Sequence, residues 1–396
     1  MDSRTMRLGD VIDIYSGGTP SKKNPDYWNG DIPWVSAKSM NADRINENVL
    51  FISGEGLAAG SRLAESGTIL LLTRGSGLFT RIPVIWVDNP VAYNQDIKCL
   101  KAKNPDDARF IYHWLVAQRQ LFSKTLDVTG IGAGKINTDQ LQDMKIYWPD
   151  AETRQRIAEI ADPIIESIHL NRQINDYLDE LATSLFDNWL CGLESSTTIG
   201  EIAQEILDYT KLTLPFVRLI NSSDVTEGVF PNPEPVANKD LKGHFKKRFQ
   251  KYDILYSEIR PRNHHYGYVL FDAHDWISTT RLMVIRNRPE MISSGLLYYY
   301  LKSKRTTDEF TLKTETRSGT FPQGKYADMA SVEIPYAPVE FQVEISNQIE
   351  AILELIHANQ EENLFLESLR DTLLPKLMSG EIDVSELNLS MQPNNH

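Results

Sequence analysis

The chain contains a long internal repeat. The stretch from Leu141 to Gly192 is echoed 188 positions later by the stretch from Met329 to Gly380. The clearest matching words are Ile168-His169-Leu170-Asn171 and Ile356-His357-Ala358-Asn359. A period of this length is far longer than the ~20 to 50 residues of a solenoid repeat. The repeat therefore predicts two tandem domains, each followed by a helix.

Both repeated stretches have the pattern of a long amphipathic helix. Apolar residues recur at a three-four spacing close to the heptad period: Ile157, Ile160, Ile164, Ile168, Ile174, Leu178, Leu181 and Leu185 in the first copy, and Ile345, Ile352, Ile356, Leu366, Leu369 and Leu373 in the second. At ~1.5 Å per residue, about 40 residues form a rod of roughly 60 Å. A lone helix of that length would leave its apolar stripe in water, so we expect the two helices to pair.

Asn171 and Asn359 occupy equivalent positions near the midpoints of these helices. If the helices run antiparallel, the two asparagines are expected to meet. A polar pair in an apolar seam lowers stability but fixes register, which makes this pair a candidate for setting the alignment of the helices. The alternative is that both asparagines are partly exposed and have no such role.

Between the helices, β-type runs alternate with short helices. The runs 68–73, 84–87 and 97–100 of the first copy are matched in order by 253–257, 268–271 and 282–285 of the second. We predict an α+β fold with two tandem mixed α/β domains, each followed by a long helix, and the helices pairing as an antiparallel coiled coil with pseudo-two-fold symmetry. The expected divisions are a first domain at 1–150, a central helix at 151–192, a second domain at 193–338, a C-terminal helix at 339–380 and a tail at 381–396.

The net charge of −13 argues at first sight against a nucleic-acid partner. Its distribution removes the objection, because residues 152–194 carry 3 basic against 9 acidic side chains and residues 341–396 carry 2 against 10. The acidity therefore lies on the predicted helices, and the two domains are nearly neutral and free to carry local basic patches. The two cysteines, Cys99 and Cys191, suggest no disulfide framework, and no run reaches the ~18 apolar residues of a membrane span. We expect a cytoplasmic protein.

Several sequence motifs carry a family resemblance. They are Leu8-Gly9-Asp10, Gly17-Gly18-Thr19-Pro20-Ser21, the segment from Tyr27 to Val35, and Leu373-Leu374-Pro375-Lys376-Leu377-Met378-Ser379-Gly380-Glu381-Ile382. With them the chain resembles, over essentially its whole length, the specificity (S) subunit of type I restriction-modification enzymes. The second domain lacks the Gly-Gly-Thr-Pro word, so the loop that contains it need not have the same role there.

The resemblance implies two target-recognition domains, each binding one half of an asymmetric bipartite site in double-stranded DNA. It also implies that the helices hold the domains apart and dock partner subunits: methyltransferase (M) subunits, expected to be two, and restriction (R) subunits. Such a chain catalyses nothing and holds no cofactor itself. S-adenosylmethionine would serve the M subunits, which methylate adenine N6, and ATP and Mg would serve the R subunits, in the cytoplasm of a bacterium or archaeon.

Candidate DNA contacts are basic, amide and hydroxyl side chains in loops, because Lys and Arg grip phosphates while Arg, Asn and Gln read base edges. In the first domain they are Thr19, Ser21, Lys22, Lys23, Arg74, Ser76, Arg81, Asn94, Gln95 and Lys135. In the second they are Lys246, Lys247, Arg248, Arg260, Arg262, Asn263, His264, Arg281, Arg317, Ser318, Gln323 and Lys325. The basic run from Lys239 to Lys251 is either a phosphate-binding surface or an ordinary solvated face.

Enzyme motifs are incomplete. The loop Gly130-Ile131-Gly132-Ala133-Gly134-Lys135-Ile136 is one residue shorter than a Walker A loop and lacks its final Ser or Thr. The adjacent His264 and His265 set no metal-ligand geometry on their own. We expect no catalytic and no metal-binding residues in this chain. The alternative function is a coiled-coil interaction scaffold or adaptor in phage defence that has no sequence-specific DNA binding of its own.

Overall fold

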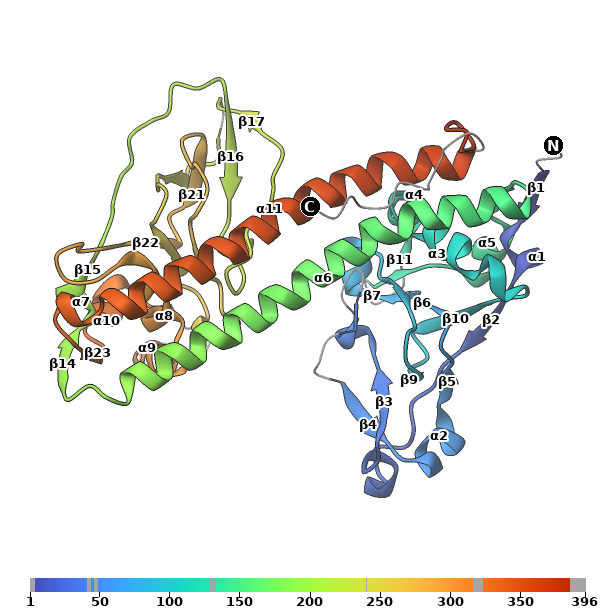
Figure 1. Cartoon of the computed structure of the whole chain (residues 1–396), viewed down its shortest axis with the longest axis horizontal. Helices are drawn as coiled ribbons and strands as arrows, with labels where there is room; N and C mark the ends of the chain where they lie inside the picture. Colours follow the sequence, from blue (N-terminus) through green and yellow to red (C-terminus); the bar gives the residue numbers. More distant parts are fainter. Residues whose placement is uncertain are drawn as a thin grey trace, which may run out of the picture. The chain divides into compact units, whose positions relative to one another are not determined.

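The structure is a computed structural model and describes residues 4–40, 44–45, 49–128, 133–239, 241–315 and 323–384. Its contacts divide the chain into two compact units, Met1–Ile168 with Phe365–His396 and His169–Leu364. Two long helices, α6 (Ala151–Leu190) and α11 (Val343–Ser379), are green and red in Figure 1. Because the unit boundaries fall inside both helices, each helix contributes residues to both units.

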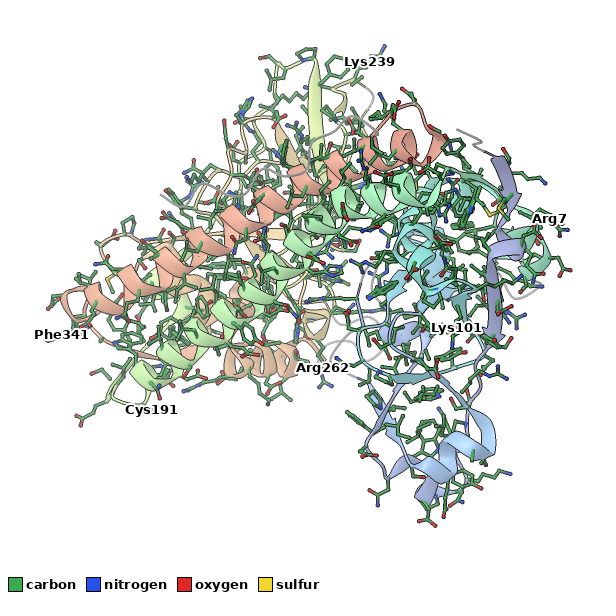
Figure 2. The ribbon with its side chains drawn as sticks, turned by 45° about the vertical axis from the view of Figure 1, so that its right-hand side comes forward. Arg7, Lys101, Cys191, Lys239, Arg262 and Phe341 are labelled. Carbon is green, nitrogen blue, oxygen red and sulfur yellow. The ribbon has the colours of Figure 1, made fainter. Side chains whose placement is uncertain are left out.

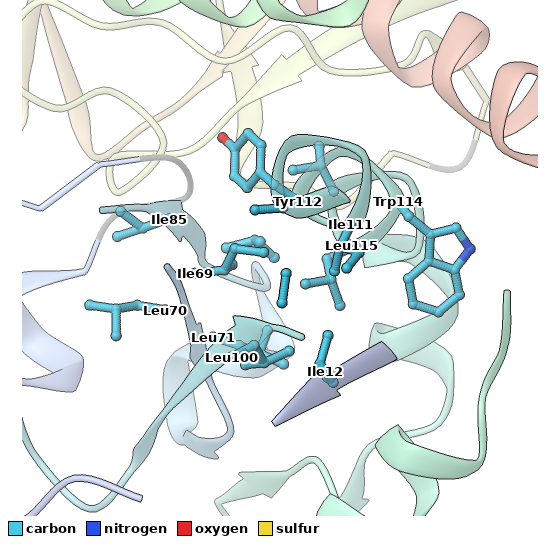
Figure 3. Close-up of a cluster of buried hydrophobic side chains, with 14 of the residues drawn as sticks. Ile12, Ile69, Leu70, Leu71, Ile85, Leu100, Ile111, Tyr112, Trp114 and Leu115 are labelled. Atoms are coloured by element: carbon cyan, nitrogen blue, oxygen red, sulfur yellow. The ribbon is translucent and has the colours of Figure 1, made fainter. Parts of the chain in front are cut away.

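The core of the first unit is an antiparallel sheet covered by helices. Its strands have the order β2-β10-β6-β8 and span Ile12–Ser16, Ile97–Ala102, Ile69–Leu72 and Val84–Trp86. Helices α3 (Ala108–Ala117) and α4 (Arg119–Lys124) follow this sheet in sequence. Leu70, Leu100 and Ile111 are fully buried in one apolar core (Figure 3). Tyr112 and Trp114 lie in the same core, as expected for aromatic residues at that spacing.

Smaller elements complete the first unit. A second sheet of order β4-β3-β9-β5 consists of Leu50–Ile52, Ile32–Val35, Val91–Tyr93 and Arg62–Ala64, with β3 and β9 parallel. A third, of order β11-β12-β7, consists of Asp127–Val128, Gly134–Lys135 and Arg74–Gly75. Strand β1 (Arg4–Arg7) pairs with β13 (Lys145–Trp148), and the short helices are α1 (Leu8–Val11), α2 (Gly54–Gly60) and α5 (Thr138–Asp143).

The second unit repeats this topology. Its antiparallel sheet of order β15-β22-β19-β20 consists of Ala203–Glu205, Leu282–Asn287, Ile254–Ser257 and Tyr266–Tyr268. Its second sheet, β17-β16-β21-β18, consists of Val236–Ala237, Phe216–Ile220, Trp276–Thr279 and Phe245–Lys247, again with a parallel central pair, β16 and β21. Strand β14 (Ser195–Thr198) pairs with β23 (Glu333–Tyr336), and the helices are α7 (Ile199–Ile202), α8 (Ser294–Lys302), α9 (Lys304–Glu315) and α10 (Tyr326–Ala330). Five of the six predicted β-type runs are confirmed as β6, β8, β10, β19 and β22. The run 268–271 is wrong, because β20 covers Tyr266–Tyr268 and ends where that run begins.

The long helices pack against both cores. In the first unit, Ile157 of α6 and Leu377 of α11 belong to one buried cluster. In the second, Phe186 of α6 and Ile349 of α11 belong to another. The N-terminal half of one helix thus shares a core with the C-terminal half of the other in each unit, which confirms that the pair is antiparallel.

The expected meeting of Asn171 with Asn359 is wrong. Asn171 instead donates hydrogen bonds to the side-chain oxygens of Glu362 at 2.9 Å and Asn363 at 3.2 Å, and Asn359 donates to Asn175 at 2.8 Å. Asn175 and Asn363 are themselves related by the 188-residue repeat. In an antiparallel pair, residues equivalent by the repeat meet only where the local two-fold axis crosses the helices. Here the axis passes between Asn171 and Asn175 of α6 and between Asn359 and Asn363 of α11. The alignment therefore rests on two repeat-related Asn-Asn pairs.

Helix α6 is tied to the first domain by a buried polar cluster. His113 of α3 has no exposed surface, and its Nε2 is bonded to the carboxylate of Asp162 on α6. Arg109 lies 2.6 Å from the same carboxylate and stacks 4.6 Å from the Trp86 ring. Burial lowers the pKa of His113, so the imidazole is neutral and donates to Asp162. Burial acts to raise the pKa of Asp162, but the hydrogen bonds from His113 and Arg109 outweigh it and lower that pKa.

Candidate nucleic-acid interface

In the first unit, the Gly-Gly-Thr-Pro motif packs closely against the backbone at the end of β9. This close packing positions a pair of polar side chains, Thr19 and Gln95. A Cβ on Gly17 would lie 2.3 Å from the Tyr93 carbonyl oxygen and 2.4 Å from that of Asn94, so only glycine fits. Gly18 donates a 2.9 Å hydrogen bond to the Tyr93 carbonyl. The following Thr19 donates its hydroxyl to Gln95 Oε1 at 2.7 Å, and both side chains are exposed. The structure thus brings together two of the predicted DNA-binding residues, one from the segment after β2 and one from the turn after β9.

Arg74 and Lys135 are also brought together. They are direct neighbours across the β7–β12 pair, although 61 positions separate them in sequence. Lys98 of β10, which the sequence analysis passed over, belongs to the same group, because Arg74 and Lys135 both act electrostatically on it. Burial lowers the pKa of Lys98, and the two neighbouring cations lower it further. In sequence, Lys98 is a polar residue alternating with Ile97 and Cys99, which is the pattern of any strand with one face toward solvent.

The other first-unit candidates fall into two groups. Asn94 is only 6% exposed and is used internally, since its side chain bonds Asp96 and its backbone bonds Val35. It is a structural residue of the turn after β9, which corrects its assignment as a DNA contact. The rest lie on the surface: Ser21, Lys22, Lys23, Ser76 and Arg81, the last with its guanidinium 3.4 Å from the Met40 carbonyl oxygen.

In the second unit, the loop after β19 is conformationally strained. Arg260 and His264 have left-handed φ values of 48° and 53°, which are uncommon for residues other than glycine. The loop is held by Glu227, itself at φ 49°, whose backbone N–H donates to the His264 carbonyl and whose carboxylate lies 2.9 Å from His264 Nδ1. Arg262 and Asn263 are exposed within it, and Arg262 is labelled in Figure 2. Such strain costs ~1 to 3 kcal/mol per residue and gathers at functional sites.

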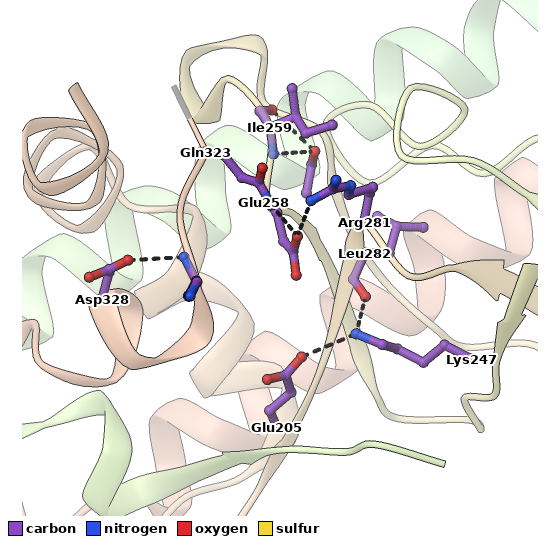
Figure 4. Close-up of polar contacts among 10 residues, drawn as sticks. Glu205, Lys247, Glu258, Ile259, Arg281, Leu282, Gln323 and Asp328 are labelled. Carbon is purple, nitrogen blue, oxygen red and sulfur yellow. Dashed lines mark hydrogen bonds and ion pairs between the residues drawn. The ribbon is translucent and has the colours of Figure 1, made fainter. Parts of the chain in front are cut away.

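Glu258 organises the base of this loop (Figure 4). Its carboxylate accepts a 3.1 Å hydrogen bond from the Gln323 amide and lies 3.5 Å from the Arg281 guanidinium. Gln323 is also bridged to Ile259 through the backbone. Glu258, Arg281 and Gln323, which come from distant parts of the chain, therefore form one polar cluster. Arg281 and Gln323 were predicted from the sequence, whereas Glu258 was not.

The basic run from Lys239 to Lys251 is only partly exposed to solvent. Lys247 is 2% exposed, and its ammonium group bonds Glu205 at 3.1 Å and the Leu282 carbonyl at 2.8 Å (Figure 4). This corrects its assignment as a phosphate contact, since alternate residues of β18 point inward. Lys246 is exposed and lies 5.4 Å from the Tyr209 ring, whereas Arg248 is half-buried beside the His274 carbonyl.

The remaining second-unit candidates are placed differently. Lys325 is exposed ahead of α10, where its backbone N–H donates to Asp328. Arg317 and Ser318 lie outside the described residues, as do Gly130, Ile131 and Gly132. Within the described part of the chain, no group of three His, Cys, Asp or Glu side chains is arranged to hold a metal ion. No helix there is both long enough and apolar enough to cross a membrane.

Comparisons with known proteins are consistent with this geometry. A family model described as "Type I restriction modification DNA specificity domain" matches residues 1–180 and 220–367. The type I restriction enzyme MjaIX specificity subunit of Methanocaldococcus jannaschii is 23% identical over 423 residues, covering 96% of this chain and 94% of its own. The HindI specificity subunit of Haemophilus influenzae is 34% identical over 179 residues, covering 44% of this chain and 39% of its own.

A solved structure shares the fold. The S subunit of a type I restriction-modification system from M. genitalium aligns over 96% of both chains with a TM-score of 0.55 and 16% sequence identity. At that identity the likeness concerns the fold alone. It covers both repeated units and both long helices.

Proposed function

The chain belongs to the family of type I restriction-modification DNA specificity subunits, and we propose that it binds an asymmetric bipartite site in double-stranded DNA, one half-site for each unit. The observation that carries this proposal is the repeated fold with different side chains at the corresponding loops. Both units have the same strand order, yet the loop after β6 contains Gly75 and Gly77 where the loop after β19 contains Arg260 and Arg262. Two units with the same strand order but different side chains in their DNA-facing loops suit two different half-sites.

The partner subunits would dock on the long helices. Tyr177 and Leu181 of α6 are 70% and 51% exposed, and their repeat equivalents Phe365 and Leu369 of α11 are 66% and 38% exposed. Large apolar side chains exposed on a helix surface are typical of protein interfaces. Because the two patches are related by the repeat, they suit two copies of one partner. We assign them to two M subunits, with R subunits joining the complex.

The chemistry would reside in those partners. M subunits would bind S-adenosylmethionine and flip the target adenine out of the duplex, and R subunits would use ATP and Mg. This chain would supply no catalytic residue and no cofactor site, and its work is positioning. The alternative of a scaffold without sequence-specific DNA binding finds no support in the family to which the chain belongs.

The proposal is tested by selecting DNA with the full-length chain purified alone and with M subunits. Fragments recovered from a random duplex library and then sequenced should share two short conserved blocks separated by a fixed spacer. Recovery of a single contiguous block, or of no enriched sequence while the complex stays assembled, would favour the scaffold.

A further inference from the structure

The first unit carries a cation cluster formed by Arg74, Lys98 and Lys135. Arg74 is exposed, and Lys98 and Lys135 are half-buried. The Lys98 ammonium donates to the Ser16 hydroxyl. Within the described residues, Lys101 on the same strand pairs with Glu65 at 2.6 Å, whereas the three members of the cluster form no ion pair. The nearest acidic neighbour in register is the exposed Asp127, opposite Lys135 across the β11–β12 pair.

Backbone hydrogen bonds define the equivalent positions in the second unit. Thr73 donates to the Asp96 carbonyl at 2.8 Å and accepts from Ile136 at 2.9 Å. In the second unit, Glu258 donates to the Arg281 carbonyl at 2.9 Å and accepts from Gly324 at 2.8 Å. Thr73 therefore corresponds to Glu258, and the same alignment relates the two strand registers.

This alignment replaces every cation of the cluster by a neutral residue. Arg74 corresponds to Ile259, Lys98 to Met283 and Lys135 to Gln323, in the two registers that pair Arg74 with Lys135 and Ile259 with Gln323. The basic residues of the second unit stand instead in the loop, where Arg260 corresponds to Gly75. Both residues have positive φ, 48° and 149°. The two units thus share a scaffold but carry their positive charge at different places.

We infer that the Arg74–Lys98–Lys135 cluster binds the phosphate backbone of the first half-site, and that the second unit has no counterpart of it. This inference rests on the proposed function. It adds that this phosphate contact is made by the first unit and not by the second. Three like charges brought together without a carboxylate partner create a positive potential that a polyanion neutralises. Lysines such as Lys98 and Lys135 make poor base readers but good phosphate contacts, because an ammonium group is a point charge without a bidentate fork.

The test exchanges the cluster for the residues of the second unit. Binding of the full-length chain to a pool of random-sequence 40-base-pair duplexes is measured by fluorescence anisotropy between about 50 and 300 mM KCl. Each phosphate contact contributes about 0.9 to the slope of log K against log salt concentration. The Arg74→Ile/Lys98→Met/Lys135→Gln variant should lose about 2 to 3 from that slope. The single variant Lys98→Met should lose about 1, and Lys101→Gln on the same strand should lose none.

The sequence preference is measured in parallel by selection from a random library. Both half-site sequences should be unchanged in the variants, because phosphate contacts carry no base information. A slope equal to that of the wild type in the well-folded single variant would overturn the inference, as would an altered first half-site. Failure of the wild-type chain itself to bind the duplex pool in a salt-dependent way would instead reject the proposed function. The two failures are therefore distinguishable.

Discussion

Asn359 donates a 2.8 Å hydrogen bond to Asn175 across the helix pair, and the repeat-related Asn171 and Asn363 are bonded at 3.2 Å. Asn171 and Asn363 are 9% and 7% exposed, so these amides are largely removed from water. Asn171 and Asn359 each donate a hydrogen bond to the side-chain oxygen of an asparagine on the partner helix. The alignment of the helices is thereby tied to hydrogen bonds that a shift by one turn would break.

The first prediction is a coupling between these asparagines. Asn359→Leu removes the donor to the Asn175 side-chain oxygen and should lower the free energy of unfolding by about 1 to 2 kcal/mol, because that oxygen is left without its hydrogen bond in the seam. The double variant Asn175→Leu/Asn359→Leu should cost less than the sum of the single variants. Urea unfolding of the four proteins in this cycle measures the coupling. Strictly additive effects would show that the pair does not hold the register.

A second prediction concerns the glycine that supports Thr19. Gly17→Ala forces a methyl group against the carbonyl oxygens of Tyr93 and Asn94, so the backbone must move. The cost should be about 1 to 3 kcal/mol of unfolding free energy, together with weakened binding of the first half-site. Gly54→Ala is the matched control, since a Cβ there meets nothing within 4 Å. Equal thermal stability of the two variants would contradict the packing argument.

Third, the loop after β19 should read bases of the second half-site. Arg260→Gly removes the side chain while keeping a residue that tolerates the left-handed backbone, as Gly75 does in the first unit. Selection from a random duplex library should show relaxed preference in one half-site only, by about 1 to 3 kcal/mol. The control Lys304→Ala removes a cation of the same unit that lies outside this loop and pairs with Asp308. Uniform weakening without any loss of preference would demote Arg260 to a phosphate contact.

Fourth, acid should weaken the attachment of α6 to the first domain. The pKa of His113 is lowered in the folded chain by burial, whereas an unfolded histidine titrates near ~6.5. Below that value the unfolded chain binds more protons, so the free energy of unfolding falls as the pH drops from about 7 to 5. His113→Gln should reduce this slope, and the exposed His274→Gln should leave it in place. Thermal melts across that pH range provide the measurement, and an unchanged slope in His113→Gln would reject the assignment.

Much of the fold could be predicted from periodicity. The 188-residue echo and the apolar spacing of Ile157 to Leu185 predict two domains with two long helices, because apolar residues that recur every three to four positions lie on one face of a helix. The β-type runs around Leu70 and Leu255 become central strands. Strand order and the parallel pairs β3–β9 and β16–β21 could not be predicted, since they depend on contacts between segments far apart in the chain.

The errors in the candidate site have local causes. Lys247 stands in a basic run, and composition cannot show that this one lysine points inward to Glu205. Lys98 was passed over because its alternation with apolar residues is that of an ordinary strand, and its cationic neighbours come from distant segments. The error at Asn359 arose because the repeat gives which residues are equivalent but not where the two-fold axis crosses the helices.

Sequence recognition by this chain is tested most directly by methylome sequencing of cells that express M subunits with the chain and of cells that express M subunits without it. If this chain recognises the DNA sequence, one bipartite adenine-methylated motif should be present only in the cells that express the chain. In that background, Arg260→Gly should relax one half of the motif and leave the other half and the spacer unchanged. The same methylation motif with and without the chain, or a single contiguous motif, would contradict the assignment of sequence recognition to this subunit.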